Sequence, residues 1–249
     1  MASILDRYGI KEVADVTFYE INDDGSRGNP VLYLDTLKVS TIEQTAEQTE
    51  ARGGKGNPPL IIWDYGKEVN VTLEDALFSS KSLAIMFGDG TVGSDTTLRK
   101  TVAFVGTTEP TEWIGPDGTS YAITTPVITD SEGRTKSETA GPDTFVDLVE
   151  GERYYASFDI AVAGKTVTIS ALNFPGTYYV TGDTYARSDV TGKDEFFQFI
   201  IPKAKMNAEN TITLEAEGDP SVFNMSLRVL RPADGQMMKL VQYSINAEG

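Results

Sequence analysis

The chain is most distinctive at residues 40–67, which read STIEQTAEQTEARGGKGNPPLIIWDYGK. In an extended conformation, the first arm places threonine and glutamate on one face and isoleucine, alanine and glutamine on the other, so neither face can enter a core. Arg52–Pro59 is rich in glycine and proline and predicts a flexible, cationic turn. Leu60–Tyr65 returns as an arm of β-branched and aromatic residues. The stretch therefore predicts a long β-hairpin over about residues 37–70.

The polar first arm predicts that the hairpin is completed by other copies of the chain. A strand that is polar on both faces has a weakly specified register and leaves its hydrogen-bonding edge open. Hairpins lying side by side would close into an inner barrel around a water-filled lumen, and an anionic lumen repels DNA phosphates. The residues expected to face the lumen are Glu43, Thr45, Glu47 and Thr49. The residues expected at contacts between copies are Gln44, Gln48, Arg52, Lys55, Trp63 and Tyr65.

The rest of the chain carries the pattern of a mainly β protein. Short β-branched and aromatic runs are separated throughout by Gly, Asp, Ser and Thr. The expected fold is an antiparallel β-sandwich or squashed barrel with one flanking α-helix. Strands are predicted at Thr166–Leu172, Phe196–Ile201, Thr211–Glu217 and Met225–Leu230, the second of them buried on both faces. Turns are predicted at Asn22–Gly25, Gly115–Gly118 and Glu217–Pro220.

One segment has a helical period. Thr72–Asp75 resembles a capping box, because a threonine hydroxyl can accept from the amide three residues on and acidic residues favour a helix N-terminus. Gly88 is suited to end the helix in a left-handed conformation. We therefore predict a helix over about residues 73–87 that contacts a neighbouring copy. Its expected contact residues are Leu73, Leu77 and Phe87.

Composition divides the chain into three parts. Residues 1–88 are expected to form a body that contains the hairpin and the helix, and residues 145–249 to complete the same β-sandwich. Residues 89–144 are richer in Thr, Gly, Ser and Asp, which predicts an insertion of loops and short strands with a long exposed loop at Asp130–Asp143.

Composition also excludes several kinds of chemistry. The 249 residues include no cysteine and no histidine, which removes disulfides, thiolate and imidazole metal ligands, and the usual nucleophile–base relays. Gly53–Gly56 lacks the spacing of a phosphate-binding loop, so we expect no cofactor, no metal and no enzymatic activity. A formal net charge of −16 argues against binding nucleic acid through its phosphates. The amino terminus lacks the apolar core of a signal peptide, and no stretch is long enough to span a membrane.

The chain resembles the tail tube proteins of long-tailed bacteriophages in four runs, which are Glu47–Pro58, Trp63–Glu68, Leu73–Phe78 and Phe223–Pro232. The resemblance implies a β-sandwich with one flanking helix and a long hairpin that lines a tube. It further implies hexameric rings stacked into the tail of the virion, assembled in the host cytoplasm around a tape-measure protein and joined to tail terminator and baseplate or tip proteins. DNA would pass through this tube without specific binding.

Two other functions remain open at this point. One is a tail terminator or hub subunit of related fold, which forms a single ring. The other is a carbohydrate-binding or adhesion module on the virion exterior, for which Trp113 and residues 89–144 would matter.

Overall fold

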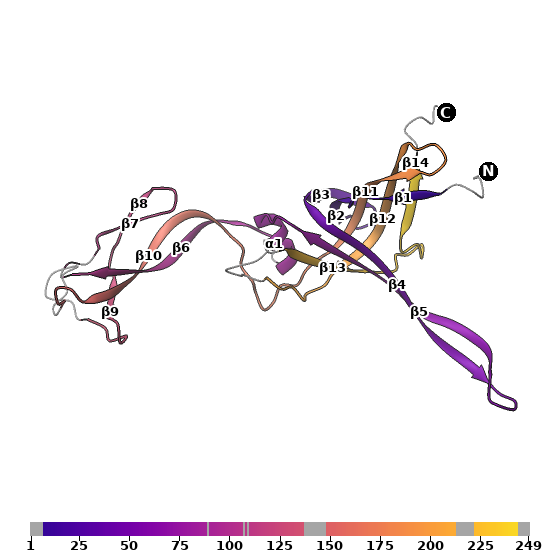
Figure 1. Cartoon of the computed structure of the whole chain (residues 1–249), viewed down its shortest axis with the longest axis horizontal. Helices are drawn as coiled ribbons and strands as arrows, with labels where there is room; N and C mark the ends of the chain where they lie inside the picture. The colour runs from indigo at the N-terminus through magenta and orange to yellow at the C-terminus, as the bar shows by residue number, and fades with distance from the viewer. Residues whose placement is uncertain are drawn as a thin grey trace. The chain divides into compact units, whose positions relative to one another are not determined.

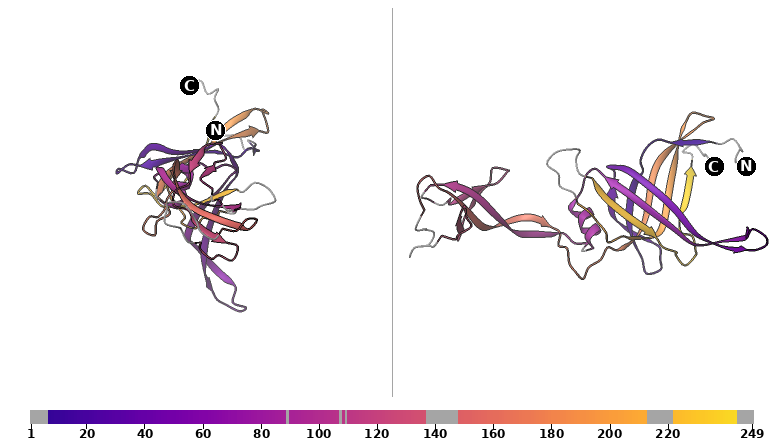
Figure 2. Two further views of the ribbon diagram at one scale, coloured as in Figure 1. Left: turned by 90° about the vertical axis from the view of Figure 1, so that its left-hand side faces the viewer. Right: turned by 60° about the horizontal axis from the view of Figure 1, so that its bottom comes forward.

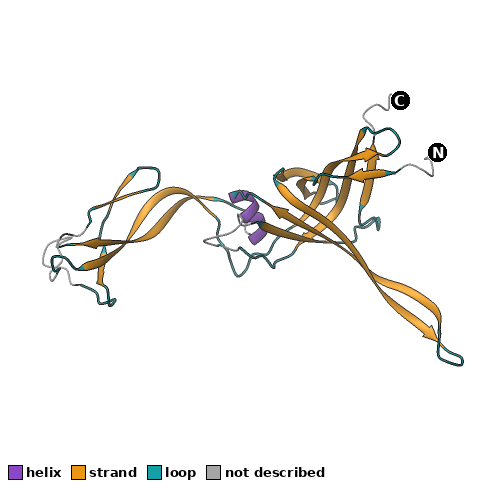
Figure 3. Ribbon diagram, viewed as in Figure 1, coloured by secondary structure: helices purple, strands orange, loops and turns teal. Residues whose placement is uncertain are grey.

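The computed structural model describes residues 7–88, 90–106, 108, 110–136, 148–212 and 222–243. The chain forms two compact units, a larger one from residues 1–92 and 167–249 and a smaller one from Gly93–Thr166 (Figure 1). Strands dominate the described residues, which contain one helix (Figure 3). The predicted fold class, mainly β and antiparallel, is confirmed.

The larger unit is built on a nine-stranded sheet in which every pairing is antiparallel. Its strands are β1 (Tyr8–Ile10), β2 (Asp15–Ile21), β3 (Arg27–Leu34), β4 (Leu37–Arg52), β5 (Pro59–Asp75), β11 (Thr177–Ser188), β12 (Asp194–Met206), β13 (Phe223–Val229) and β14 (Lys239–Tyr243). The order along the sheet is β3-β2-β11-β12-β13-β5-β4, with β1 also paired to β11 and β14 to β12. The long strand β4 therefore lies at one edge of the sheet.

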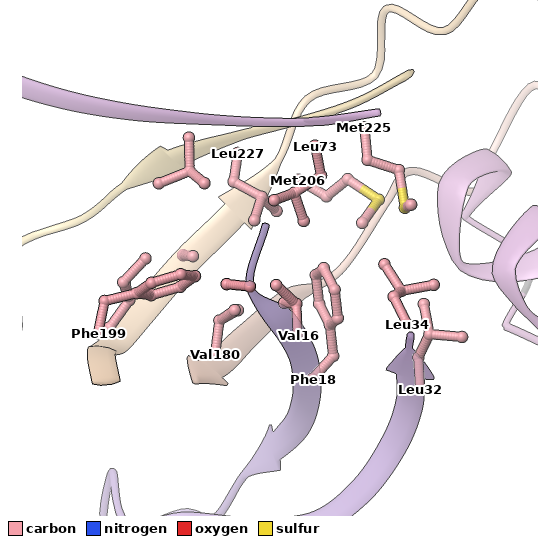
Figure 4. Close-up of a cluster of buried hydrophobic side chains, with 14 of the residues drawn as sticks. Val16, Phe18, Leu32, Leu34, Leu73, Val180, Phe199, Met206, Met225 and Leu227 are labelled. Atoms are coloured by element: carbon pink, nitrogen blue, oxygen red, sulfur yellow. The ribbon is translucent and has the colours of Figure 1, made fainter. Parts of the chain in front are cut away.

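The sheet folds over itself so that two layers of side chains meet in one core (Figure 4). Val16 and Phe18 of β2 lie in one layer, and Leu73 of β5 lies in the other. Along β2 and β13, buried residues alternate with less buried ones, as expected of a strand that faces solvent on one side. The fold is thus the predicted sandwich, made from one bent sheet.

The helix α1 (Ser80–Phe87) is shorter than predicted and starts later. Ser79 is its N-cap, and the true capping box links Ser79 with Ser82, whose backbone N–H donates to the Ser79 hydroxyl at 3.0 Å. Thr72–Asp75 instead continues β5, because alternate residues from Val69 to Asp75 are buried in the sheet and this two-residue period outweighs a local capping pattern. Gly88 ends the helix with a φ of +90°, as predicted.

The other predicted strands have mixed outcomes. The alternation at Met225–Leu230 is confirmed in β13. In Phe196–Ile201, part of β12, only Phe199 and Ile201 are buried, so burial on both faces was wrong. The strand predicted at Thr166–Leu172 is also wrong, because residues 167–172 pair with none of the described strands and expose Ile169 and Leu172. Most of Thr211–Glu217 lies outside the described residues.

Two of the predicted turns are present. Gly25 N donates to Asn22 O between β2 and β3, and Gly118 N donates to Gly115 O in the smaller unit. The turn predicted at Glu217–Pro220 lies outside the described residues.

The smaller unit pairs β6 (Gly93–Val105) with β10 (Arg153–Thr166) and β10 with β9 (Val127–Asp130). A separate hairpin joins β7 (Glu112–Ile114) to β8 (Ser120–Ala122). Its core gathers around the fully buried Tyr154 and Ile128. The unit runs to Thr166, whereas the sequence division placed the end of the insertion at residue 144.

A tight turn follows β9 where the sequence predicted a long loop. The Asp130 carboxylate accepts from the backbone N–H of Arg134 at 2.9 Å, and this bond is the main reason that the pKa of Asp130 is lowered to about 2. Burial of Asp130 opposes this shift and an ion pair with Arg134 supports it. Residues 137–143 of the predicted loop lie outside the described residues. Across the parts that are described, no helix has the length and apolarity needed to cross a membrane.

Candidate assembly surface on the β4–β5 hairpin

The predicted hairpin is present and projects from the larger unit (Figures 1 and 2). β4 has 16 residues and β5 has 17, and they pair along their length. At the tip, Asn57 N donates to Gly54 O at 3.1 Å. Gly54, Gly56 and Asn57 all have positive φ, which glycine and asparagine tolerate best. The Gly-rich sequence of the tip thus closes the turn without strain on bulky residues.

A β-bulge divides the hairpin into two halves. Thr45 pairs with Glu68, but Glu47 pairs with Tyr65, so β5 carries one extra residue at this point. Gly66 has a φ of +62°, a conformation typical of a glycine bulge residue. We call residues 37–46 with 67–75 the proximal half, and residues 47–52 with 59–66 the distal half.

The proximal half has one buried face and one polar face. On the buried face, Val69, Val71 and Leu73 of β5 belong to the core. On the opposite face, Glu43 pairs with Asn70 and Thr45 pairs with Glu68. Glu68 also forms an ion pair with Arg228 of β13. One face of the proximal half is therefore anchored in the core, and the opposite face presents a polar, partly anionic surface to solvent.

The distal half has no core behind it, and its return arm is strongly apolar. The apolar residues of this arm are about half exposed or more; they are Leu60 at 65%, Ile61 at 52%, Ile62 at 51%, Trp63 at 50% and Tyr65 at 52%. Exposed apolar surface of this kind on a soluble chain marks an interaction site. The distal half is thus a candidate contact surface.

The register brings together residues that the sequence analysis assigned to different roles. Glu47 pairs with Tyr65 and Thr49 pairs with Trp63, so each pair shares one face of the hairpin. Two residues predicted for the lumen therefore lie beside two predicted for contacts between copies. Gly66 directly after Tyr65 was the sequence signal for the bulge that sets this register, and the sequence analysis missed it.

Two of the four polar residues predicted for contacts, Gln48 and Arg52, already have partners within the hairpin. Gln48 Nε2 donates to Asp64 Oδ1 at 2.8 Å, and Arg52 Nε donates to Glu50 Oε2 at 2.7 Å. Lys55 lies exposed at the tip, and Gln44 lines a surface groove of about 450 Å³ with Met237. None of these positions is buried against the body.

The predicted helix contacts are dispersed. Leu73 is fully buried in β5 and takes no part in the helix, so that prediction was wrong. Leu77 lies in the bend before α1 and is 63% exposed. Phe87 is the last residue of α1 and packs against the core.

Both edges of the distal half are open. Within the described residues, no strand pairs with the outer edge of β4, and β13 pairs only with residues 70–75 of β5. An open edge presents free backbone N–H and C=O groups that another strand can bind. The hairpin therefore combines two binding edges with an apolar arm.

The other kinds of site to consider in the described residues are a metal site and a sugar-binding aromatic residue. Among these residues, no group of three or more acidic side chains could hold a metal ion. Trp113 is partly buried, with its ring 5.6 Å from that of Tyr121 and Lys100 lying over it at 5.1 Å. It packs on the core of the smaller unit, which leaves its ring little open face for a sugar.

Comparison with known proteins gives two matches that span nearly the whole chain. The sequence profile of the YomU/Tube protein family matches residues 8–242. A protein of Bacillus phage SPR, named "Tail tube protein", is 24% identical over 245 residues, which cover 93% of this chain and 87% of the relative. The family match includes the whole hairpin and the whole of the smaller unit.

Proposed function

This chain belongs to the YomU/Tube protein family, and we propose on that ground that it is a structural subunit of a phage tail tube. The match over residues 8–242 carries the proposal, together with the name of the Bacillus phage relative. The hairpin gives this role a physical basis, because it projects open edges and apolar side chains that a lone subunit leaves unpaired.

In this proposal, hairpins of neighbouring subunits pair side by side. The outer edge of β4 in one copy binds the outer edge of residues 59–69 of β5 in the next copy. Each copy uses a different edge on each side, so the contact is head to tail, and a rotation between copies that closes turns it into a ring. A closed ring leaves no hairpin edge free, which removes the tendency to aggregate. We take the ring to be hexameric, as the resemblance to tail tube proteins implies.

The polar face of the proximal half lines the lumen. Glu43 and Thr45 lie on this face beside Glu68, with the core directly behind them. Carboxylates facing the lumen repel DNA phosphates and reduce sticking during genome passage. Glu47 and Thr49 continue this face into the distal half, where Tyr65 and Trp63 accompany them. The chain acts by geometry and charge, without catalysis.

The other partners follow from this placement. A tape-measure protein occupies the lumen during assembly in the host cytoplasm and is later replaced by DNA. Its contacts to the proximal face are with polar side chains, so no large apolar surface holds it in place. A tail terminator and baseplate or tip proteins cap the two ends of the tube in the virion.

The proposal is tested by negative-stain electron microscopy of the purified protein at high concentration. We expect the intact chain to form hollow tubes and a variant lacking Gln44–Pro59 to form none. A matched control replaces the β7–β8 turn, Gly115–Thr119, with a short glycine linker and should still form tubes. Persistent monomers of the intact chain would contradict the proposal, and single rings that never extend would favour the terminator or hub alternative.

A further inference from the structure

The strands β1 and β2 pair with the same edge of β11 and leave a gap between them. β1 pairs with residues 186–188 of β11, and β2 pairs with residues 179–183 (Figure 1). Residues 11–14 join the two strands and pair with none of the described strands. Thr184 Oγ1 donates to the carbonyl of Glu12 at 3.0 Å and holds this connection in place. A surface hollow of about 380 Å³ lies at the gap, and its lining residues are Gly9, Lys11, Glu12, Tyr185, Arg187 and Asp194.

Gly9 leaves the space beside Arg187 open. The two residues pair across β1 and β11, so a side chain at position 9 would lie on the same face as Arg187. A Cβ added to Gly9 would meet no heavy atom within 4 Å beyond its chain neighbours. Gly9 does not have a positive φ, so the backbone conformation does not require glycine there. The missing side chain therefore keeps the hollow open.

An aromatic side chain, Tyr185, lines the hollow and is held by two further rings. Tyr185 of β11 pairs with Phe196 of β12, which pairs in turn with Tyr243 of β14. The ring centroids of Tyr185 and Phe196 are 4.9 Å apart, and those of Phe196 and Tyr243 are 5.1 Å apart. Tyr185 is nevertheless 48% exposed. Its ring is thus already ordered, so a ligand does not pay the entropy of fixing it.

The charged side chains of the hollow balance one another. Arg187 Nε and Nη2 donate to the two carboxylate oxygens of Asp194 at 2.7 Å and 2.8 Å. This bidentate pair fixes both groups but uses only two of the N–H donors of the guanidinium and part of the acceptor capacity of the carboxylate. Lys11 and Glu12 add one charge of each sign. The hollow therefore offers donors and acceptors side by side without a net charge.

From these features we infer that the hollow binds a neutral sugar. A pyranose ring has a face of C–H groups, which suits the electron-rich face of the Tyr185 ring. Its hydroxyl groups both donate and accept hydrogen bonds, as the Arg187–Asp194 pair requires of a ligand. An acidic ligand is disfavoured, because Glu12 and Asp194 repel it. The volume lies at the lower end of the range of about 300–1,000 Å³ for ligand pockets, which suits a short saccharide.

Sugar binding would be a second function, beyond the building of a tube. The proposed lumen face belongs to β4 and β5, whereas the hollow is formed by β1, β11, β12 and the connection after β1, so the two functions use different residues. The side chains of Arg187 and Asp194 are 66% and 48% exposed, so a single site is shallow and binds weakly. An assembly of many copies binds a surface that displays many sugars through several sites at once. The site would thus attach the assembled protein to a glycan-coated surface.

Ligand-observed NMR titration of the full chain tests the inference. The probes are neutral trisaccharides built from glucose, galactose, mannose or N-acetylglucosamine. We expect at least one of them to bind, and Tyr185→Ala to weaken its binding by roughly tenfold or more, because the ring face is lost. Tyr185→Phe keeps the ring and should bind like the unchanged chain, as should Tyr33→Ala, which removes a 57% exposed tyrosine outside the hollow. Binding of none of these sugars, or undiminished binding by Tyr185→Ala, would overturn the inference.

A second variant, Gly9→Leu, blocks the hollow without removing any side chain. It should abolish sugar binding and leave the urea unfolding midpoint unchanged, because the added Cβ meets open space. Undiminished binding by Gly9→Leu would count against this hollow as the site. Loss of binding in Trp113→Ala, with binding kept in Gly9→Leu, would place the sugar on the smaller unit instead and overturn the inference. Tubes are scored separately by electron microscopy, so an intact chain that forms tubes but binds no sugar leaves the proposed function standing.

Discussion

The two halves of the β4–β5 hairpin share one ladder of strand pairing but differ in what surrounds them. In the proximal half, β5 buries Val71 and Leu73 completely, and the opposite face is polar. In the distal half, both faces meet solvent and residues such as Trp63 remain half exposed. The difference shows that strand pairing alone does not decide the role of a residue. The proximal half is stabilised within the chain, and we expect the distal half to be stabilised by other copies.

The largest expected effect is on the free energy of unfolding, which a substitution in the proximal half should lower much more than one in the distal half. Leu73→Ala should lower the free energy of unfolding of the monomer by about 2–5 kcal/mol, because it leaves a cavity in the core. Trp63→Ala should lower it by about 1 kcal/mol or less, since it loses only cross-strand contacts, yet it should abolish tubes. Urea unfolding followed by far-ultraviolet circular dichroism, at concentrations that keep the protein monomeric, measures the free energy of unfolding of both variants. Equal losses for the two variants would remove the distinction between the halves.

An intermediate effect should arise at the bulge that divides them. Gly66→Ala forces a side chain into a left-handed conformation, which costs roughly 1–2 kcal/mol. The strain should shift the register of the distal half, so we expect fewer and shorter tubes by electron microscopy. Gly53→Ala, at a tip glycine without positive φ, should leave both stability and tube length unchanged. Normal tubes from Gly66→Ala would mean that the bulge does not set the position of the distal half.

The smallest expected effect on the free energy of unfolding comes from substitutions on the lumen face, which should instead change the rate of DNA ejection. Glu43→Lys and Glu47→Lys lie on exposed positions and should each change the free energy of unfolding by less than about 0.5 kcal/mol. In virions at low salt, Glu43→Lys should slow DNA ejection, because a cation in the lumen attracts phosphate. Glu47→Lys should slow it less, since Tyr65 lies beside it. High salt should remove the difference by screening, and unchanged ejection at low salt would contradict the lumen assignment.

Much of the hairpin could be predicted from sequence because its signals are local. The Gly-rich tip and the β-branched return arm predict a hairpin without reference to the rest of the chain. The resemblance to tail tube proteins rested on the same residues and is confirmed by the family match. The helix end at Gly88 is equally local and was predicted correctly.

Two of the wrong predictions depended on neighbours distant in sequence. Thr72–Asp75 has a helical capping pattern, but pairing with β13 makes it a strand and buries Leu73. Residues 167–172 alternate like a strand, but they pair with none of the strands that the structure describes. Local preference is worth a fraction of a kcal/mol per residue, so tertiary contacts override it.

By itself, the sequence determined that this chain is mainly β, that it carries a polar-then-apolar hairpin, and that it contains no cysteine or histidine. These properties depend on composition and on short patterns, which act within a few residues. Only the tertiary structure decided that β5 carries an extra residue at the bulge beside Gly66, and that Glu47 therefore pairs with Tyr65. Register and exposure depend on which segments pack together, and that choice is made by the whole core rather than by any one stretch.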